Sequence, residues 1–130
     1  MACTAKATIF LLLAALICSV LAGNDQGSCQ VSDIRVSQVL TGKVVEGKTE
    51  FQVTIANQCS CPQAEVIVRC IGLSSVGTTV DKTKIQLLNG DLCRVANGGP
   101  IVRGSPVIFT YAYAQKTPLY FPIVSAKPRC

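Results

Sequence analysis

Two cysteines separated by one serine, Cys59 and Cys61, are the residues of this chain best placed to do chemistry. A Cys-x-Cys pair can supply half of a metal site, form a redox couple, or anchor two disulfides that lead elsewhere. A direct bond between the two would close a strained ring, because a disulfide needs Cβ atoms about 3.5–4.5 Å apart. The spacing therefore favours disulfides to other cysteines.

The chain contains no histidine, which bears on both catalysis and metal binding. Histidine is the usual general base of nucleophilic catalysis and the usual nitrogen ligand of zinc. A zinc site made of cysteines alone would need a second Cys-x-Cys or Cys-x-x-Cys knuckle, but Cys59 and Cys61 form the only one in the sequence. The seven carboxylates are scattered, whereas a glycoside hydrolase needs two that flank the scissile bond. We predict no catalytic residue, no metal ligand and no cofactor.

The first residues of the chain indicate export from the cell. Lys6 precedes an uncharged apolar run over residues 9–21, and residues 20–22 place a β-branched and a small residue where signal peptidase cleaves. The run is shorter than the roughly 20 residues of a transmembrane helix, although a signal anchor is the alternative. We predict a signal peptide at residues 1–22 and a single secreted, cysteine-rich β domain at residues 23–130, with no membrane span, located in the apoplast.

The predicted domain keeps six cysteines, an even number that is typical of a disulfide framework in a short exported chain. A hairpin of residues 29–40 and 49–57, folded about residues 44–45, would place Cys29 opposite residue 60. Cys29 should then pair with Cys59 or Cys61, and the remaining connections stay open. The six predicted half-cystines are Cys29, Cys59, Cys61, Cys70, Cys93 and Cys130.

Short alternating segments separated by glycine, asparagine and proline predict strands and turns, and no segment of the domain has a helical period. The fold class that we predict is all-β, a small disulfide-stapled antiparallel β-sandwich of about seven strands. The expected strands are residues 31–40, 51–56, 64–71, 85–88, 92–95, 107–113 and 119–124.

Three of these segments carry more detailed expectations. Residues 64–71 are apolar on both faces, which is typical of a central strand. Alternate residues from Val107 to Tyr113 share one face, so this should be the main aromatic core strand, and Phe51 should join it in the core. Two prolines, Pro118 and Pro122, predict that the last strand lies at a sheet edge.

The net charge of +5 is mild, and the basic residues are scattered along the chain. Nucleic-acid surfaces interleave basic and aromatic residues, and this pattern is absent, so we expect no nucleic-acid partner. A mildly basic surface suits an acidic wall polysaccharide or an acidic protein face. Ordinary solubility is the simpler interpretation.

A series of motifs is more specific than any single one. The segments are F-Q-V-T-I-A-N-Q-C (51–59), I-V-R-C-I-G-L-S-S (67–75), C-R-V-A-N-G-G-P (93–100) and F-T-Y-A (109–112). Their order, together with the six cysteines, resembles the plant tapetum determinant family of secreted cysteine-rich proteins over residues 29–130. The resemblance implies a ligand of a leucine-rich-repeat receptor kinase in anther cell-fate signalling, and it does not imply catalysis.

The contact surface of such a ligand should be formed by loops and strand edges. Four basic residues are expected on or beside loops, where they could contact an acidic concave receptor face. These residues are Lys82, Lys84, Arg94 and Arg103. The alternative function is a wall-associated carbohydrate-binding or defence protein without catalytic activity, and a line of exposed aromatic residues would favour glycan binding.

Overall fold

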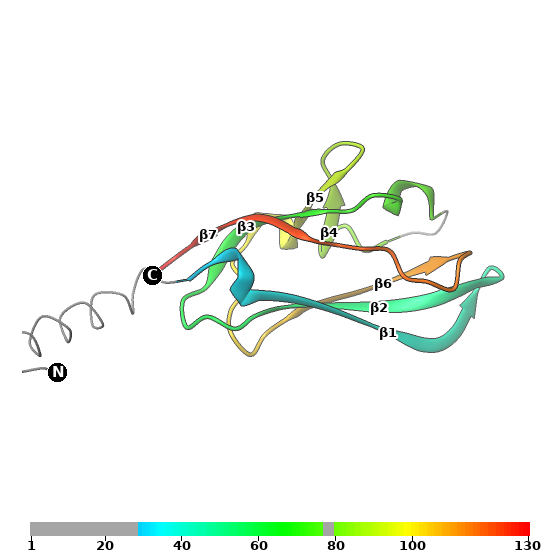
Figure 1. Ribbon diagram of the computed structural model, residues 1–130, viewed down its shortest axis with the longest axis horizontal. Helices are drawn as coiled ribbons and strands as arrows, with labels where there is room; N and C mark the ends of the chain where they lie inside the picture. Colours follow the sequence, from blue (N-terminus) through cyan, green and yellow to red (C-terminus); the bar gives the residue numbers. More distant parts are fainter. Residues whose placement is uncertain (1–28, 77–79) are drawn as a thin grey trace, which may run out of the picture.

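Two antiparallel sheets form the two layers of the protein (Figure 1). The computed structural model describes residues 29–76 and 80–130, so the predicted signal peptide lies outside the described residues. The prediction of an all-β sandwich of about seven strands is confirmed. The strands are β1 (Ile34–Val45), β2 (Lys48–Asn57), β3 (Gln63–Arg69), β4 (Ile85–Leu87), β5 (Leu92–Val95), β6 (Val107–Tyr113) and β7 (Ile123–Pro128).

The first hairpin, β1–β2, is longer than predicted and turns at a different place. Residues 31–33 form a 3-10 turn because the Asp33 side chain accepts a hydrogen bond from the Gln30 N–H at 2.8 Å, and β1 therefore begins at Ile34. The chain reverses at residues 46–47, where Gly47 has a positive φ of 78° that glycine adopts at little cost. The predicted reversal at residues 44–45 was wrong.

A β-bulge explains the shifted register of this hairpin. Leu40 pairs with Phe51, but Val44 pairs with Thr49, so the pairing slips between Leu40 and Val44. Gly42 lies within the slip with a φ of +87°. Bulges of this kind bend a strand and add twist.

The three-stranded sheet has the order β1-β2-β6 and carries most of the aromatic core. Phe51 stacks on Tyr111 with ring centroids 5.3 Å apart, and Phe121 meets the edge of Tyr111 at 5.8 Å. The predicted core role of Phe51 and β6 is confirmed, except that Tyr113 is only half-buried. Phe121, which comes from the segment before β7, is buried as well.

The four-stranded sheet has the order β4-β5-β3-β7, which makes β3 central and β7 an edge strand, as predicted. The last strand begins four residues later than predicted. Pro118 and Pro122 have no N–H for a ladder, and the Leu119 N–H donates to the Tyr111 hydroxyl, so residues 119–122 cross between the sheets instead. Strand β7 then pairs with β3.

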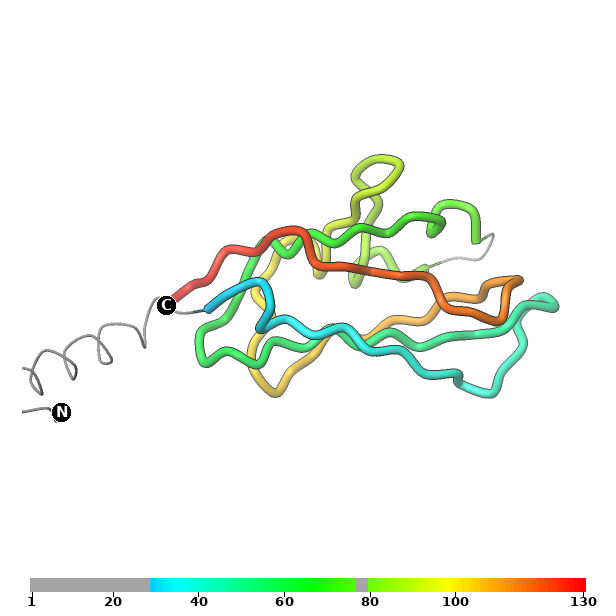
Figure 2. Tube along the Cα trace, in the orientation of Figure 1, coloured from blue at the N-terminus to red at the C-terminus, as the bar shows by residue number. Residues whose placement is uncertain are grey.

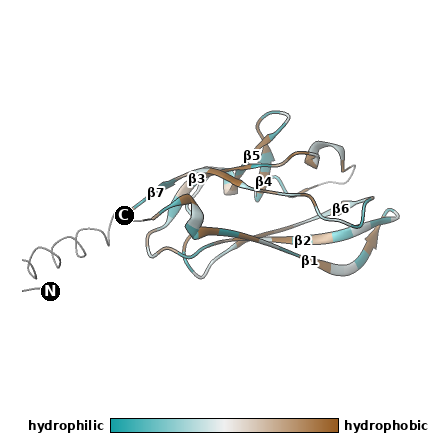
Figure 3. Ribbon diagram, in the orientation of Figure 1, coloured by the Kyte–Doolittle hydropathy of each residue, from teal (hydrophilic) through white to brown (hydrophobic). Residues whose placement is uncertain are grey.

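The core lies between the two sheets and is formed by alternate residues of their inner faces. Figure 3 shows the apolar and polar residues alternating along the strands. Val53 and Ile55 of β2, and Val66 and Val68 of β3, are completely buried. Figure 2 shows that the chain brings its C-terminal residue back beside the first described residues. This return places the three segments that hold Cys29, Cys59 with Cys61, and Cys130 at one end of the sandwich.

Candidate functional site

Two disulfides close the end of the sandwich where β2 leads into β3. Cys29 bonds to Cys59, with Cα atoms 5.6 Å apart, and Cys61 bonds to Cys130, with Cα atoms 5.0 Å apart. The structure thus selects Cys59 from the two alternatives for Cys29, although Cys29 lies before the 3-10 turn and outside the hairpin register. Cys59 and Cys61, separated only by Ser60, are therefore bonded to cysteines at opposite ends of the described chain, Cys29 and Cys130.

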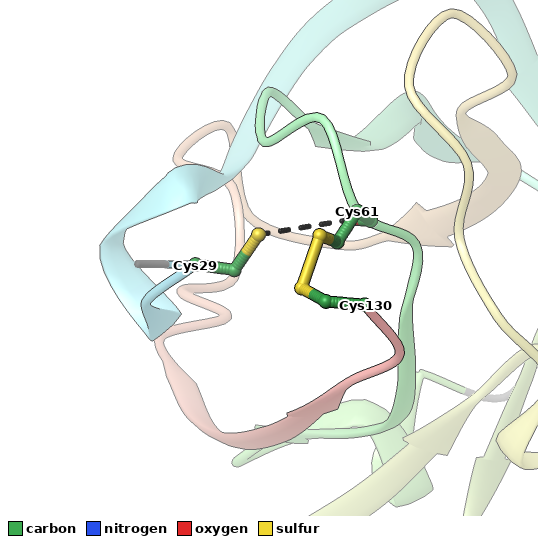
Figure 4. A group of neighbouring side chains, drawn as sticks. All are labelled: Cys29, Cys61 and Cys130. Atoms are coloured by element: carbon green, nitrogen blue, oxygen red, sulfur yellow. Dashed lines mark hydrogen bonds between the residues drawn. A yellow bond between two sulfur atoms is a disulfide. The ribbon is translucent and has the colours of Figure 1, made fainter. Parts of the chain in front are cut away.

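These two disulfides lie against each other. The Sγ atoms of Cys29, Cys61 and Cys130 all lie within 4.8 Å of one another, and Figure 4 shows the three side chains converging. The Cys29 Sγ is 3.9 Å from the Cys61 carbonyl oxygen. This grouping has the spacing of a metal site, but its sulfurs are bonded in disulfides and therefore are not thiolate ligands. The cluster is a covalent staple.

A buried amide pair supports the staple from inside. The Nδ2 of Asn57 donates to the carbonyls of Cys61 and Ile101 at 2.8 and 2.9 Å, and its Oδ1 accepts from the Cys59 N–H at 3.0 Å. Gln63 is fully buried, and its Nε2 donates to the same Oδ1 at 3.2 Å. Asn57 therefore uses its donors and acceptor to fix the path of the chain between the two cysteines.

The third disulfide, Cys70–Cys93, lies in the core rather than at an end. Both cysteines are completely buried, and the bond joins the segment after β3 to β5. The three disulfides use the six cysteines of the described chain, and no cysteine among residues 29–76 and 80–130 is a thiol. Such a framework is typical of small proteins of oxidising compartments.

The four basic residues proposed as receptor contacts do not form one cluster. Lys82 and Lys84 are exposed in the turn before β4, and Arg103 is exposed in the loop before β6, after the bridge of Gln63 with Ile101. Arg94 lies within β5, the strand expected at residues 92–95, where it pairs with both Gln86 and Ile67. The alternation of β5 turns Arg94 to the outer face of the sheet and the disulfide-bonded Cys93 to the core.

An open groove of about 550 Å³ lies at the other end of β3, and no pattern in the sequence predicted it. Its lining combines Arg69, the last residue of β3, and Ile71 in the following turn with Tyr113 and the crossing segment that holds Tyr120. Tyr120 is 79% exposed, the most of any large apolar residue of the described chain. The adjacent Phe121 is buried, which is the alternation that turns Tyr120 outward.

Comparison with known proteins assigns the family. A protein-family model described as "Tapetum determinant 1, C-terminal" matches residues 30–128. The TPD1 protein homolog 1 of Arabidopsis thaliana is 33% identical over 99 residues, which are 75% of this chain and 55% of that relative. The chain therefore spans about half the length of this curated relative. No solved structure matches the chain.

Fold and cysteines together define a small, disulfide-stapled β-sandwich domain. Because the family match runs from before β1 to the end of β7, it covers the whole sandwich. The chain belongs to the tapetum determinant family, as the order of its motifs predicted. Within the described part of the chain, no helix is long and apolar enough to cross a membrane.

Proposed function

We propose that this protein is a secreted cysteine-rich signal, the ligand of a plant leucine-rich-repeat receptor kinase in cell-fate specification of the anther or tapetum type. The observation that carries the proposal is the family match, which includes all seven strands of the sandwich. The three disulfides support an extracellular location, because such bonds persist in oxidising compartments. The protein acts by binding and without catalysis.

Export is the first step that the proposal requires. Residues 1–22 act as the signal peptide, and residues 23–130 form the secreted domain. Expression of the full chain in plant cells, followed by N-terminal sequencing of the protein in the medium, tests this directly. A chain retained in the membrane fraction with residues 1–22 attached would support the signal-anchor alternative.

Receptor binding is the second step. The basic side chains of Lys82, Lys84 and Arg94 lie on the β4–β5 side of the four-stranded sheet and are available to an acidic concave receptor face. Arg103 lies apart from them and would form a separate contact. The experiment is a pull-down of the purified secreted protein with a panel of leucine-rich-repeat ectodomains, with cellulose, callose and pectin as competitors.

We expect one ectodomain to bind saturably and to remain bound in the presence of the glycans. The double variant Lys82→Glu, Lys84→Glu should weaken this binding by about tenfold, the equivalent of about 1.4 kcal/mol. The double variant Arg35→Glu, Lys43→Glu on β1 of the opposite sheet reverses the same number of charges; it is the matched control and should bind like the wild type. Binding to glycan alone would support instead a wall-associated carbohydrate-binding or defence protein.

A further inference from the structure

The groove at the end of β3 exposes apolar side chains that the fold does not need there. Tyr120 is 79% exposed and Ile71 is 58% exposed, and both line the groove. The volume of about 550 Å³ is in the range of natural ligand sites, which runs from about 300 to 1,000 Å³. An exposed tyrosine ring offers a flat apolar surface with a hydroxyl at its tip.

The guanidinium group of Arg69 places a positive charge at the rim of this groove. Arg69 is exposed at the end of β3, and within residues 29–76 and 80–130 it forms no ion pair. Asp91 precedes Leu92, the ladder partner of Arg69, and it forms no ion pair with Arg69 either. The guanidinium group therefore keeps its planar set of donors for an external carboxylate, which it can bind through two parallel hydrogen bonds.

A second arginine lies on the same face. Ile67 pairs with Arg94 and Arg69 pairs with Leu92, so the two arginines occupy diagonal positions of one ladder, about 7–8 Å apart by the usual geometry. The Nε of Arg94 is buried without a hydrogen-bond partner. The outer face of β3 and β5 therefore presents two cationic groups, Arg69 at the groove and Arg94 farther from it.

The backbone of the groove favours recognition by side chains. Pro118 and Pro122 have no N–H, the Leu119 N–H donates to Tyr111, and the Pro122 carbonyl accepts from the Arg69 N–H. A peptide strand would need several unpaired backbone groups in register to add to a sheet. A carbohydrate needs instead an aromatic surface, hydroxyl partners and, if it is acidic, a cation.

We propose that this groove binds an oligosaccharide of uronic acid units, with one sugar ring against Tyr120 and its carboxylate on Arg69. The carboxylate of a neighbouring unit reaches the Arg94 side of the same face. The size of the groove, the exposed ring and the two unpaired cations carry this inference. It goes beyond the proposed receptor function and does not depend on it, because no receptor takes part in its test.

The test uses the secreted product of the full chain and a fluorescently labelled, de-esterified oligogalacturonide, without calcium ions. We expect saturable binding, and we expect the same oligomer to lose it after methyl esterification. Arg69→Gln and Tyr120→Ala should each weaken binding by about tenfold, since one removes a charge-assisted contact and the other the ring. Arg35→Gln, which removes an equal charge from exposed β1 of the other sheet, should change the affinity less than about twofold.

Several outcomes would overturn the proposal. Absence of saturable binding would do so, as would equal losses for Arg69→Gln and Arg35→Gln, because equal losses would indicate general attraction to a polyanion. Competition by polyglutamate as strong as that by unlabelled oligogalacturonide would assign the groove to acidic peptides instead. Tyr120 is exposed, so Tyr120→Ala leaves the core intact and keeps the test decisive if Arg69→Gln folds poorly.

Discussion

The hydroxyl of Tyr111 on β6 donates a hydrogen bond to the Oε1 of Gln38 on β1, at 2.6 Å. It also accepts a hydrogen bond from the Leu119 N–H at 2.8 Å, while the Gln38 Nε2 donates to the Leu119 carbonyl. The three residues thereby join both edges of one sheet to the segment that crosses to the other. Tyr111 is 2% exposed, so water cannot replace these partners.

Tyr111→Phe should therefore destabilise the protein without changing its shape. The variant leaves the Leu119 N–H and the Gln38 Oε1 without this partner in the core, which costs about 1–3 kcal/mol of unfolding free energy. Chemical denaturation followed by circular dichroism measures the difference. Tyr120→Phe removes a hydroxyl from an exposed ring and should change the stability by less than about 0.5 kcal/mol.

Stability should also fall in strongly alkaline solution. Burial raises the pKa of Tyr111 to about 12, although the hydrogen bond from Leu119 opposes this. The unfolded chain loses this proton near pH 10.0, the ordinary pKa of tyrosine, so the stabilising contribution is complete below pH 10 and is lost as pH rises toward 12. Denaturation midpoints measured across this window should decline for the wild type and decline less for Tyr111→Phe. Equal slopes for the two proteins would contradict the assignment.

The disulfides should dominate the stability of so small a domain. Each closes a long loop of the unfolded chain, with separations of 23 residues for Cys70–Cys93 and 69 for Cys61–Cys130. The chain-entropy estimate is about 3–4 kcal/mol for each bond. Cys70→Ser or Cys93→Ser should lower the secreted yield sharply, because it also leaves an unpaired thiol in the core. Immunoblots of the medium measure the yield.

Ser60→Ala is the control for these variants. Ser60 is exposed between two half-cystines, so the Ser60→Ala protein should be secreted normally. Thiol titration of the denatured wild-type protein provides an independent check. Several reactive thiols in the domain would show that the disulfide framework is wrong.

Asn57 should be intolerant of a substitution that replaces only one heavy atom, the amide nitrogen. Asn57→Asp places an oxygen opposite the carbonyls of Cys61 and Ile101, where the amide now donates two hydrogen bonds. A buried carboxylate facing two acceptors should cost about 3 kcal/mol or more. Thermal unfolding compares it with Gln58→Asp, an exposed neighbour that should change little. A stable Asn57→Asp protein would show that the amide network does not fix the staple.

Local pattern alone could predict much of the fold. Apolar, β-branched residues on both faces of residues 64–71 predicted that β3 is central, and alternation over residues 107–113 identified the inner face of β6. Proline chemistry predicted that the last strand lies at an edge. These features depend on neighbouring residues, so a single sequence contains them.

Features that depend on distant residues were predicted less well. The reversal of the first hairpin was misplaced because the bulge at Gly42 alters the register of β1 on β2. The last strand was placed too early because the bond between Leu119 and Tyr111 competes with a ladder.

The groove could not be predicted for the same reason. Arg69 belongs to a strand that appeared apolar, and Tyr120 lies far along the chain in a segment expected to be a strand. Only the crossing between the sheets brings the two together. The disulfide partners of Cys61 and Cys70 could not be predicted from the sequence for a related reason, since sequence spacing does not determine which distant segments meet.

The bulge in β1 has a consequence for how copies of the protein behave toward one another. Strand β1 is an outer edge of twelve residues, and its exposed Val39, Leu40 and Val44 would suit it to recruit a second chain. The slip at Gly42 interrupts that edge midway, so an incoming strand cannot follow it along its length. The bulge therefore disfavours edge-to-edge association of copies of this chain.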